Sequence, residues 1–268
     1  MTAVADRTAT SGDVRIAYDV RGSGGPLLLV QGLGYARWGW EPVVDALGGR
    51  FTVVSFDNRG VGASDAPPGP YTVRELAEDA VAVLDGAGIE RAHVVGTSLG
   101  GMVAQEIALE WPKRVDRLVL ACTTPGVSGH PMPEQTVHLL LKVPTMPIDE
   151  RLRRLVENAL ADPADPGLVE RIIAHRLASP QDPGAWQAQA AAGMTFDALS
   201  RLEHIAAPTL VLQGTADVVV DPRNADLLAA RIPGARVELF PGAGHLFFWE
   251  EPERFVQVVS DFLAKGGK

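Results

Sequence analysis

Short apolar runs recur along the chain and alternate with longer helix-like segments, and this rhythm restricts the fold more than any other feature. The runs lack the polar alternation of a half-exposed strand, so each is typical of a strand covered on both faces. They begin at Pro26, Phe51, Ala92, Asp116, Pro208 and Ala235. Helix-like segments begin at Arg74, Gly100, Pro222 and Pro252. Strands alternating with helices predict an α/β fold, with a mostly parallel central sheet and helices on both of its faces.

The rhythm fails in one interval, residues 124–206, where no buried strand is apparent. "HLLLKV" and "ERLRRLVENAL" favour helices there, and the turn signals "ADPADPG" and "SPQDPG" separate them from later segments. Helices inserted between two strands of a parallel sheet often form a cap. We therefore predict a core made of residues 1–123 and 207–268, with a helical cap inserted at 124–206.

The two ends of the chain carry weaker signals. The segment "DVRIAYDVRG", from Asp13, alternates polar and apolar residues, which predicts an antiparallel strand at the edge of the sheet. The polar stretches 1–11 and 264–268 are expected to be frayed.

Composition excludes several classes of protein. The 268 residues carry a formal net charge of −9, which argues against nucleic-acid binding, because that normally needs a basic surface. No apolar run is long enough to span a membrane, and the polar start has no signal-peptide core. The single cysteine, Cys122, is expected to be a small buried hydrophobe. We therefore expect a cytoplasmic protein with no nucleic-acid or membrane partner, and the oligomeric state stays open.

The stretch Gly96-Thr97-Ser98-Leu99-Gly100 has the pattern Gly-x-Ser-x-Gly, between a predicted strand and a predicted helix. In that context the glycines allow a sharp turn, and the serine hydroxyl is held out at the end of the strand. The N-terminus of the helix behind it offers unpaired N–H groups, which suit a developing oxyanion. Ser98 is therefore the candidate nucleophile.

A serine nucleophile needs a base, and the base needs a group to orient it. His245 lies in the glycine-rich turn "PGAGHLFF", and Asp217 follows the strand "TLVLQG". Asp221 is the rival acid, but it precedes Pro222 and a helical run, which is typical of a helix N-cap. We predict the triad Ser98, His245 and Asp217, which occur in the chain order Ser, Asp, His.

Several stretches together resemble the α/β-hydrolase family over nearly the whole chain: "QGLG", "FDNRGVGASD", "GTSLGG", "GTADVVVDP" and "GAGHLFFWEEPE". Longer segments resemble its small esterase and lactonase branch, which includes 3-oxoadipate enol-lactonases, anthracycline methylesterase-like proteins and cofactor-free perhydrolases. The resemblance does not choose among these three. It implies the α/β-hydrolase fold and hydrolysis of an ester or lactone.

The resemblance also implies an oxyanion hole. In the family, one donor is the backbone N–H of the residue after a His-Gly pair. Here that pair is Gln31-Gly32, so the donor would be the N–H of Leu33, acting with the N–H of Leu99. Gln31 departs from the common histidine, which changes the surroundings of the donor without removing it, because the donor is backbone.

Candidate pocket residues are Gln31, Trp38, Met102 and Trp186. Trp38 is expected in the core or in a pocket wall. Trp186 either lines a pocket or anchors the cap, and the sequence leaves both open. In "DNRGVGASD", Asp57 and Arg59 are expected to hold their loop in place rather than to react. The histidines lack metal-like spacing, so neither a metal nor a cofactor is predicted.

These features predict a serine hydrolase that cleaves a small-molecule carboxylic ester or lactone through an acyl-enzyme. A serine at position 98 argues against dehalogenase or epoxide-hydrolase chemistry, whose family patterns have a carboxylate there. The same triad would serve a cofactor-free perhydrolase or a C–C bond hydrolase. A non-catalytic ligand-binding protein and a biosynthetic cyclase are the alternatives from other functional classes.

Overall fold

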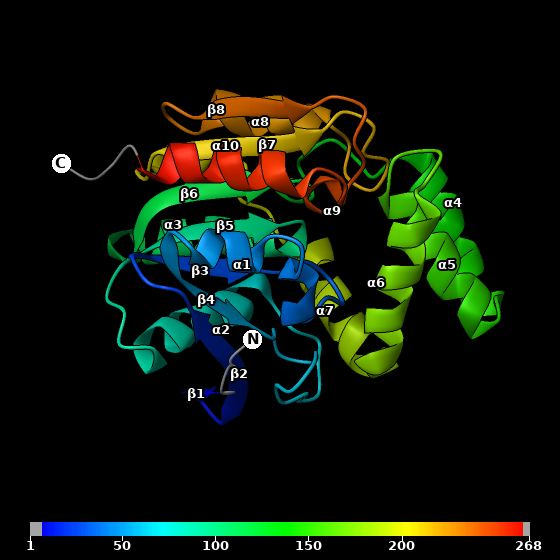
Figure 1. Ribbon diagram of the computed structural model, residues 1–268, viewed down its shortest axis with the longest axis horizontal. Helices are drawn as coiled ribbons and strands as arrows, with labels where there is room; N and C mark the ends of the chain where they lie inside the picture. Colours follow the sequence, from blue (N-terminus) through cyan, green and yellow to red (C-terminus); the bar gives the residue numbers. More distant parts are fainter. Residues whose placement is uncertain (1–6, 265–268) are drawn as a thin grey trace.

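The computed structural model describes residues 7–264, apart from the side chain of Pro144. Within this range an eight-stranded sheet has the order β1-β2-β4-β3-β5-β6-β7-β8 (Figure 1). The pairs β1–β2 and β2–β4 are antiparallel, and the other neighbours are parallel. The strands are β1 (Arg7–Ser11), β2 (Val14–Arg21), β3 (Gly25–Val30), β4 (Phe51–Phe56), β5 (Ala92–Thr97), β6 (Val115–Ala121), β7 (Thr209–Gly214) and β8 (Arg236–Phe240). The predicted fold class is confirmed.

The edge of the sheet at β1 differs from the prediction. Residues 7–11, which we expected to be frayed, form β1 and pair with β2. β2 therefore bonds to a strand on each side, and the prediction that it lies at the edge is wrong. β1 buries only Ala9, so its backbone ladder holds it in the sheet while its side chains leave no apolar pattern. Ala264, also expected to be frayed, is the last residue of α10, and the remaining residues of that prediction, 1–6 and 265–268, lie outside the described range.

Helices cover both faces of the sheet, with α2, α3 and α8 on one face and α1, α9 and α10 on the other (Figure 1). In β3, Leu28 and Val30 pack into the first layer, and Leu27 and Leu29 pack into the second. This two-sided burial explains why the strand lacks polar alternation. The helices of the two layers are α1 (Val44–Gly48), α2 (Val73–Gly86), α3 (Leu99–Glu110), α8 (Arg223–Arg231), α9 (Phe247–Glu250) and α10 (Pro252–Ala264).

Four helices stand between β6 and β7 and gather at one end of the sheet (Figure 1). They are α4 (Glu134–Lys142), α5 (Ile148–Ala159), α6 (Pro166–Ala178) and α7 (Pro183–Thr195). The chain leaves for this region and returns from it side by side, because the Val127 N–H donates to the Phe196 carbonyl at 2.9 Å and the Ala198 N–H donates to the Pro125 carbonyl at 2.8 Å. We refer to residues 127–196, which lie between these two hydrogen-bonded pairs, as the cap.

The two Asp-Pro-Gly stretches, expected as turns, are helix starts. The Asp165 side chain accepts a hydrogen bond from the Leu168 N–H at the start of α6, and Asp182 accepts one from the Ala185 N–H at the start of α7. Each aspartate is the N-cap, and the proline that follows occupies the first helical position, where its missing N–H is not needed. Over residues 7–264, no helix is both long enough and apolar enough to cross a membrane.

Candidate active site

Ser98 is the single residue between β5 and α3, and it has φ +54° and ψ −120°. Positive φ is uncommon for a residue with a side chain and stores strain at the turn. A Cβ placed on Gly96 would lie 2.2 Å from the Gly100 carbonyl oxygen, and one on Gly100 would lie 2.2 Å from the Val30 carbonyl oxygen. Both glycines are therefore required for strand and helix to approach this closely, with the serine turned out at the corner.

His245 lies in the loop between β8 and α9, and Asp217 lies in the turn after β7. His245 Nδ1 is 2.8 Å from Asp217 Oδ2. Both residues are buried, with exposed fractions of 7% and 3%. Because an ionised carboxylate only accepts hydrogen bonds, this contact places the ring proton on Nδ1 and leaves the lone pair on Nε2.

Three other donors hold the Asp217 carboxylate in place. The N–H groups of Val219 and Val220 donate to Oδ1 at 2.8 and 2.9 Å, and Gln213 Nε2 donates to Oδ2 at 2.9 Å. Gln213 is fully buried on β7. A carboxylate with this many donors keeps one orientation, as an acid that orients a histidine must.

Asp221, the rival acid, has other partners. It accepts hydrogen bonds from the backbone N–H of Arg223 at 2.9 Å and from the Arg223 guanidinium. That guanidinium hydrogen bond holds the pKa of Asp221 below its usual value. Helix α8 begins at Arg223, one residue later than predicted, and Asp221 bonds to its first residue. The structure therefore puts Asp217, and not Asp221, in contact with His245.

Ser98, Asp217 and His245 follow β5, β7 and β8, so they collect at the carboxyl edge of the sheet. Among the hydrogen bonds of residues 7–264, none joins Ser98 Oγ to His245. In ligand-free hydrolases this bond is often long and tightens when substrate binds.

Burial raises the pKa of the Cys122 thiol well above its usual range, with a further rise from Asp217, so Cys122 stays protonated and is a poor competing nucleophile.

The loop after β3 runs beside Ser98. A Cβ on Gly32 would lie 3.0 Å from Ser98 Cβ and 3.6 Å from Ser98 Oγ, so only glycine allows this approach without a shift. Leu33 follows in the loop, and Leu99 is the first residue of α3. Within the described residues, neither the Leu33 N–H nor the Leu99 N–H has a hydrogen-bond partner. Two donors near one hydroxyl are what a developing oxyanion requires.

Gln31 supports this loop. Its Oε1 accepts hydrogen bonds from the Gly32 N–H at 3.1 Å and from Thr97 Oγ1 at 3.2 Å. Its exposed fraction is 2%, and its Nε2 lies against Gly39, where a Cβ would be 2.6 Å away. The amide oxygen thus supports the loop, whereas Nε2 has no hydrogen-bond partner within residues 7–264; the substrate contact expected for Gln31 stays a prediction.

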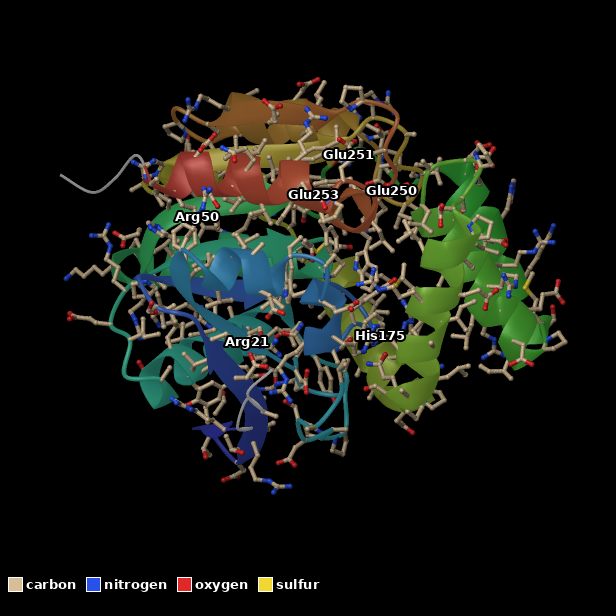
Figure 2. The ribbon with its side chains drawn as sticks, in the orientation of Figure 1. Arg21, Arg50, His175, Glu250, Glu251 and Glu253 are labelled. Atoms are coloured by element: carbon tan, nitrogen blue, oxygen red, sulfur yellow. The ribbon has the colours of Figure 1, made fainter. Side chains whose placement is uncertain are left out.

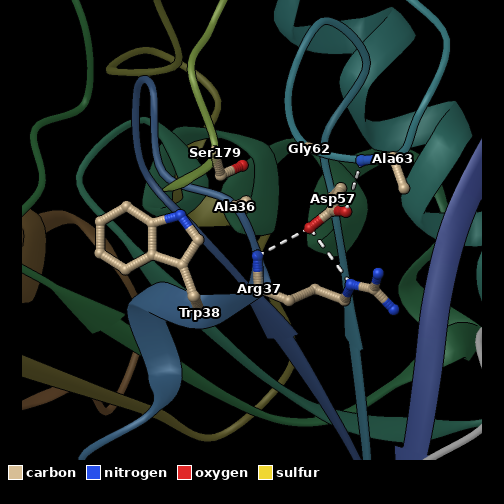
Figure 3. A pocket seen from close by; sticks show the side chains of 7 residues that line it. All are labelled: Ala36, Arg37, Trp38, Asp57, Gly62, Ala63 and Ser179. Carbon is tan, nitrogen blue, oxygen red and sulfur yellow. Dashed lines mark hydrogen bonds and ion pairs between the residues drawn. The ribbon is translucent and has the colours of Figure 1, made fainter. Parts of the chain in front are cut away.

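Trp38 lies where the core meets the cap. Its indole ring stacks on the ring of His175 from α6, with centroids 5.0 Å apart and planes 4° from parallel. Figure 2 shows His175 on the side of α6 that faces the core. Trp38 also forms one wall of an open pocket of about 360 Å³ (Figure 3). The pocket is lined by Ala36, Arg37, Trp38, Asp57, Gly62, Ala63 and Ser179, which include no member of the expected triad.

The charged groups of the "DNRGVGASD" loop have internal partners. Asp57 Oδ1 accepts from the backbone N–H of Arg37 at 2.7 Å, and Asp57 Oδ2 accepts from the Ala63 N–H at 3.0 Å (Figure 3). The buried Arg59 guanidinium donates to both carboxylate oxygens of Asp79, at 2.6 and 2.7 Å. Desolvation raises the pKa of Asp79 despite this partner. These contacts give Asp57 and Arg59 the structural role expected for them.

The cap approaches the site through α7. A Cβ on Gly34 would lie 3.2 Å from Trp186 Cδ1, and one on Gly193 would lie 3.7 Å from Met102 Sδ. Trp186 and Met102 are both half-buried. Our sequence reasoning missed Gln189, which is fully buried on the same helix. Its signal was available: a polar residue three positions after Trp186, and so on the same helix face, among alanines.

A second tie joins the cap to the histidine loop. Glu250, at the end of α9, accepts hydrogen bonds from the Gly244 N–H and the Ala161 N–H, both at 2.7 Å. Burial raises the pKa of Glu250 above its usual value. Figure 2 shows Glu250 at the end of α9 nearest the cap. The residue before His245 is thus fixed against the end of α5.

In the part of the chain that the structure describes, no group of three or more His, Cys, Asp or Glu side chains could hold a metal ion.

Comparison with known proteins gives concordant results. A family model for the alpha/beta hydrolase fold matches residues 25–252. The putative carbamate hydrolase RutD of Azorhizobium caulinodans is 30% identical over 265 residues, covering 96% of this chain and 98% of that protein. The crystal structure of a hydrolase from Pseudomonas aeruginosa PA01 superposes with a TM-score of 0.85 at 33% identity, covering 98% of each chain. The enol-lactonase from Burkholderia xenovorans LB400 has a TM-score of 0.84 at 26% identity, covering 97% of this chain and 100% of that chain.

These matches extend over the cap as well as the core, and they confirm the resemblance seen in the sequence. They place the chain among hydrolases of a common architecture, with a lactonase as one structural neighbour. The chain belongs to the α/β-hydrolase family.

Proposed function

We propose that this protein is a serine hydrolase that cleaves a carboxylic ester or a lactone through an acyl-enzyme. Ser98 is the nucleophile, His245 the general base and Asp217 the acid that orients it. The observation that supports this most is the buried hydrogen bond from His245 to Asp217, at the same sheet edge where Ser98 is held at positive φ.

Acylation begins when Ser98 Oγ attacks the carbonyl carbon of the substrate. His245 Nε2 accepts the Ser98 proton, and the nearby Asp217 carboxylate stabilises the imidazolium that forms. The N–H groups of Leu33 and Leu99 donate to the oxyanion of the tetrahedral intermediate. His245 then protonates the leaving alkoxide, which departs from an ester or stays attached to the acyl chain of an opened lactone.

Deacylation reverses these roles for water. His245 removes a proton from a water molecule, the resulting hydroxide attacks the acyl carbon, and the same two N–H groups stabilise the second oxyanion. His245 then returns the proton to Ser98 Oγ as the acid leaves. No step needs a cofactor, and the reaction partner is a small molecule.

The surroundings of Ser98 support an acyl substrate with an apolar portion. Leu99 is buried beside the nucleophile, and Leu99 Cδ1 lies 3.4 Å from the position of a Cβ on Gly193 of α7. An apolar side chain of the core thus lies between the nucleophile and α7 of the cap, as in pockets that bury an apolar ligand around a few polar groups. The cytoplasmic location expected from the sequence stays a prediction.

A hydrolysis panel tests the proposal. It compares esters with short and long acyl chains, lactones, methyl esters and a carbamate, the last because a relative bears the name of a carbamate hydrolase. We expect measurable turnover of an ester or lactone, and Ser98→Ala should lower it by about 10⁴-fold or more without changing the melting temperature. A fluorophosphonate should label Ser98 in the wild type, as seen by peptide mass spectrometry.

Three results would contradict the proposal. A Ser98→Ala variant with near-normal turnover would show that another group is the nucleophile. Labelling at Ser98 with no turnover of any panel member would favour a perhydrolase, a C–C bond hydrolase or a cyclase that uses the same triad. An unlabelled, inactive wild type would favour a binding protein on this fold.

A further inference from the structure

The loop proposed to carry one oxyanion donor is held at its tip by the cap. Gln189 of α7 has an exposed fraction of 0%, and its Oε1 accepts a hydrogen bond from the Gly34 N–H at 3.1 Å. Its Nε2 donates to the Arg59 carbonyl at 2.7 Å. One buried amide of the cap therefore joins the loop after β3 to the loop after β4.

Gly34 is the residue that decides the conformation of this turn. The Tyr35 N–H donates to the Gly32 carbonyl at 3.3 Å, which closes a four-residue turn with Leu33 and Gly34 at its centre. Gly34 has φ +73°, as expected for the third residue of a type II turn. Turns of types I and II differ by a flip of their central peptide, here the one between Leu33 and Gly34. The hydrogen bond from the Gly34 N–H to Gln189 favours one of these two orientations.

The core holds only the base of the same loop. Gln31 Oε1 accepts from the Gly32 N–H at 3.1 Å, and Asn58 Nδ2 donates to the Gln31 carbonyl at 3.0 Å. Among the hydrogen bonds of the described residues, Gln189 alone reaches the central peptide of the turn. A flip of that peptide changes ψ of Leu33 and φ of Gly34, and so turns the Leu33 carbonyl on the residue whose N–H is proposed to face the reaction.

We propose that Gln189 is a positioning residue, which fixes the turn at Gly34 and thereby holds the loop that carries the Leu33 N–H in one conformation beside the oxyanion. The inference rests on the proposed function of Ser98 and Leu33. Gln189 acts through Gly34 and does not itself touch the substrate. Through this residue, α7 determines how well the transition state is stabilised, in addition to covering the site.

A residue that merely anchored the cap would behave differently. Its loss would lower stability and loosen substrate binding, which raises KM. Loss of a positioned oxyanion donor instead lowers kcat, because the interaction forms only in the transition state. Gln181 is the matched control: its Nε2 donates to the Gly60 carbonyl at 2.9 Å and to Gln189 Oε1 at 3.2 Å, without a hydrogen bond to the loop after β3.

The experiment compares the full-length wild type with Gln189→Leu, Gln189→Glu and Gln181→Leu. For the best ester of the panel, Gln189→Leu should lower kcat by about 10- to 100-fold, the range for groups that orient a reacting group, and should leave KM within about twofold. A boronic acid, whose adduct with Ser98 places an oxygen in the oxyanion position, should lose affinity by a similar factor. Gln181→Leu should change kcat by less than about threefold, since it spares the Gly34 bond.

Gln189→Glu retains an acceptor oxygen for the Gly34 N–H, so its kcat should exceed that of Gln189→Leu. Equal losses of kcat in Gln189→Leu and Gln181→Leu, or a rise in KM at constant kcat, would overturn the proposal. Hydrogen exchange of residues 31–36 needs no turnover, and Gln189→Leu should accelerate it more than Gln181→Leu does. Unchanged exchange there would overturn the positioning role by itself, whereas a wild type that hydrolyses nothing in the panel would overturn the proposed function.

Discussion

The sheet edge that carries Ser98 is packed backbone against backbone, whereas the cap is tied to that edge mostly by side chains. Around Ser98, glycines 96 and 100 bring strand and helix so close that a single added Cβ would collide with a carbonyl oxygen. Between cap and core, Gln189 of α7 accepts from the Gly34 N–H of a core loop, and Glu250 of the core helix α9 accepts from the Ala161 N–H of the cap. The backbone packing around Ser98 tolerates almost no substitution of its glycines. The contacts between cap and core depend instead on individual polar atoms of side chains.

The two regions also differ in what they leave exposed. Apart from Leu239, the large hydrophobic side chains that stay exposed in residues 7–264 all lie between residues 127 and 194. They are Val127, Met132, Val137, Leu141, Ile148, Leu177 and Met194. The strands are buried on two faces, but helices of a cap have one face to bury. The residues of the proposed triad thus follow strands of the closely packed sheet, and the more exposed helices belong to the cap.

The largest effect should come from the acid on the sheet edge. Asp217→Asn removes the negative charge beside His245, and its amide can donate to Nδ1, which favours the tautomer with the ring proton on Nε2. Turnover should therefore fall by about 10⁴-fold while the fold persists. Asp221→Asn is the matched control, because asparagine can accept the Arg223 N–H about as well. Steady-state kinetics of both variants would check this. A large loss in Asp221→Asn with a small one in Asp217→Asn would transfer the role of acid to Asp221.

An intermediate effect is expected in the cap. Trp186 is half-buried against Gly34, so Trp186→Ala should lower the free energy of unfolding by about 1–2 kcal/mol, less than the 3–5 kcal/mol of a fully buried tryptophan. Its kcat/KM ratio between long and short acyl chains should change severalfold. Urea unfolding and the ester panel measure the two quantities. A stability loss of the full 3–5 kcal/mol with unchanged preference would make Trp186 an anchor of the cap.

The smallest effect concerns His93, also on β5 but far along the strand from Ser98. Desolvation lowers the pKa of His93 below 6.5. The unfolded chain therefore binds this proton more readily, and the contribution of His93 to stability is lost as pH falls through 6.5 toward the folded-state pKa. His93→Phe, which keeps an aromatic ring near Phe51, should lose less stability than the wild type between pH 7.5 and 5.5.

Urea unfolding at the two pH values checks the His93 prediction, and kcat at neutral pH serves as its control. An equal loss of stability in both proteins would mean that His93 is protonated as readily in the folded chain as in the unfolded one. A changed kcat would mean that a substitution within β5 alters the geometry of the turn at Ser98.

Parts of the fold and of the candidate site follow from local patterns. β3, β5 and β7 could be predicted because burial on both faces selects continuous apolar runs. The turn at Ser98 could be predicted because only glycine permits the close approach of the backbone at Gly96 and Gly100. β1 could not, because a polar edge strand is held by backbone hydrogen bonds that any residues can make. The Asp-Pro-Gly stretches marked breaks in the chain but were interpreted as turns rather than as helix N-caps.

The α/β order of elements, the sharp turn at Ser98 and the positions of an aspartate and a histidine after later strands can all be predicted from the amino-acid pattern, since each has a local or ordered signal. Other contacts depend on packing in three dimensions: Trp38 stacks on His175, Gln31 accepts a hydrogen bond from Thr97, and Gln189 reaches Gly34 across 155 positions of the chain. Such pairs join residues that are far apart in the chain. A glutamine in a helix has no local property that identifies its partner, because the partner is set by how distant segments pack.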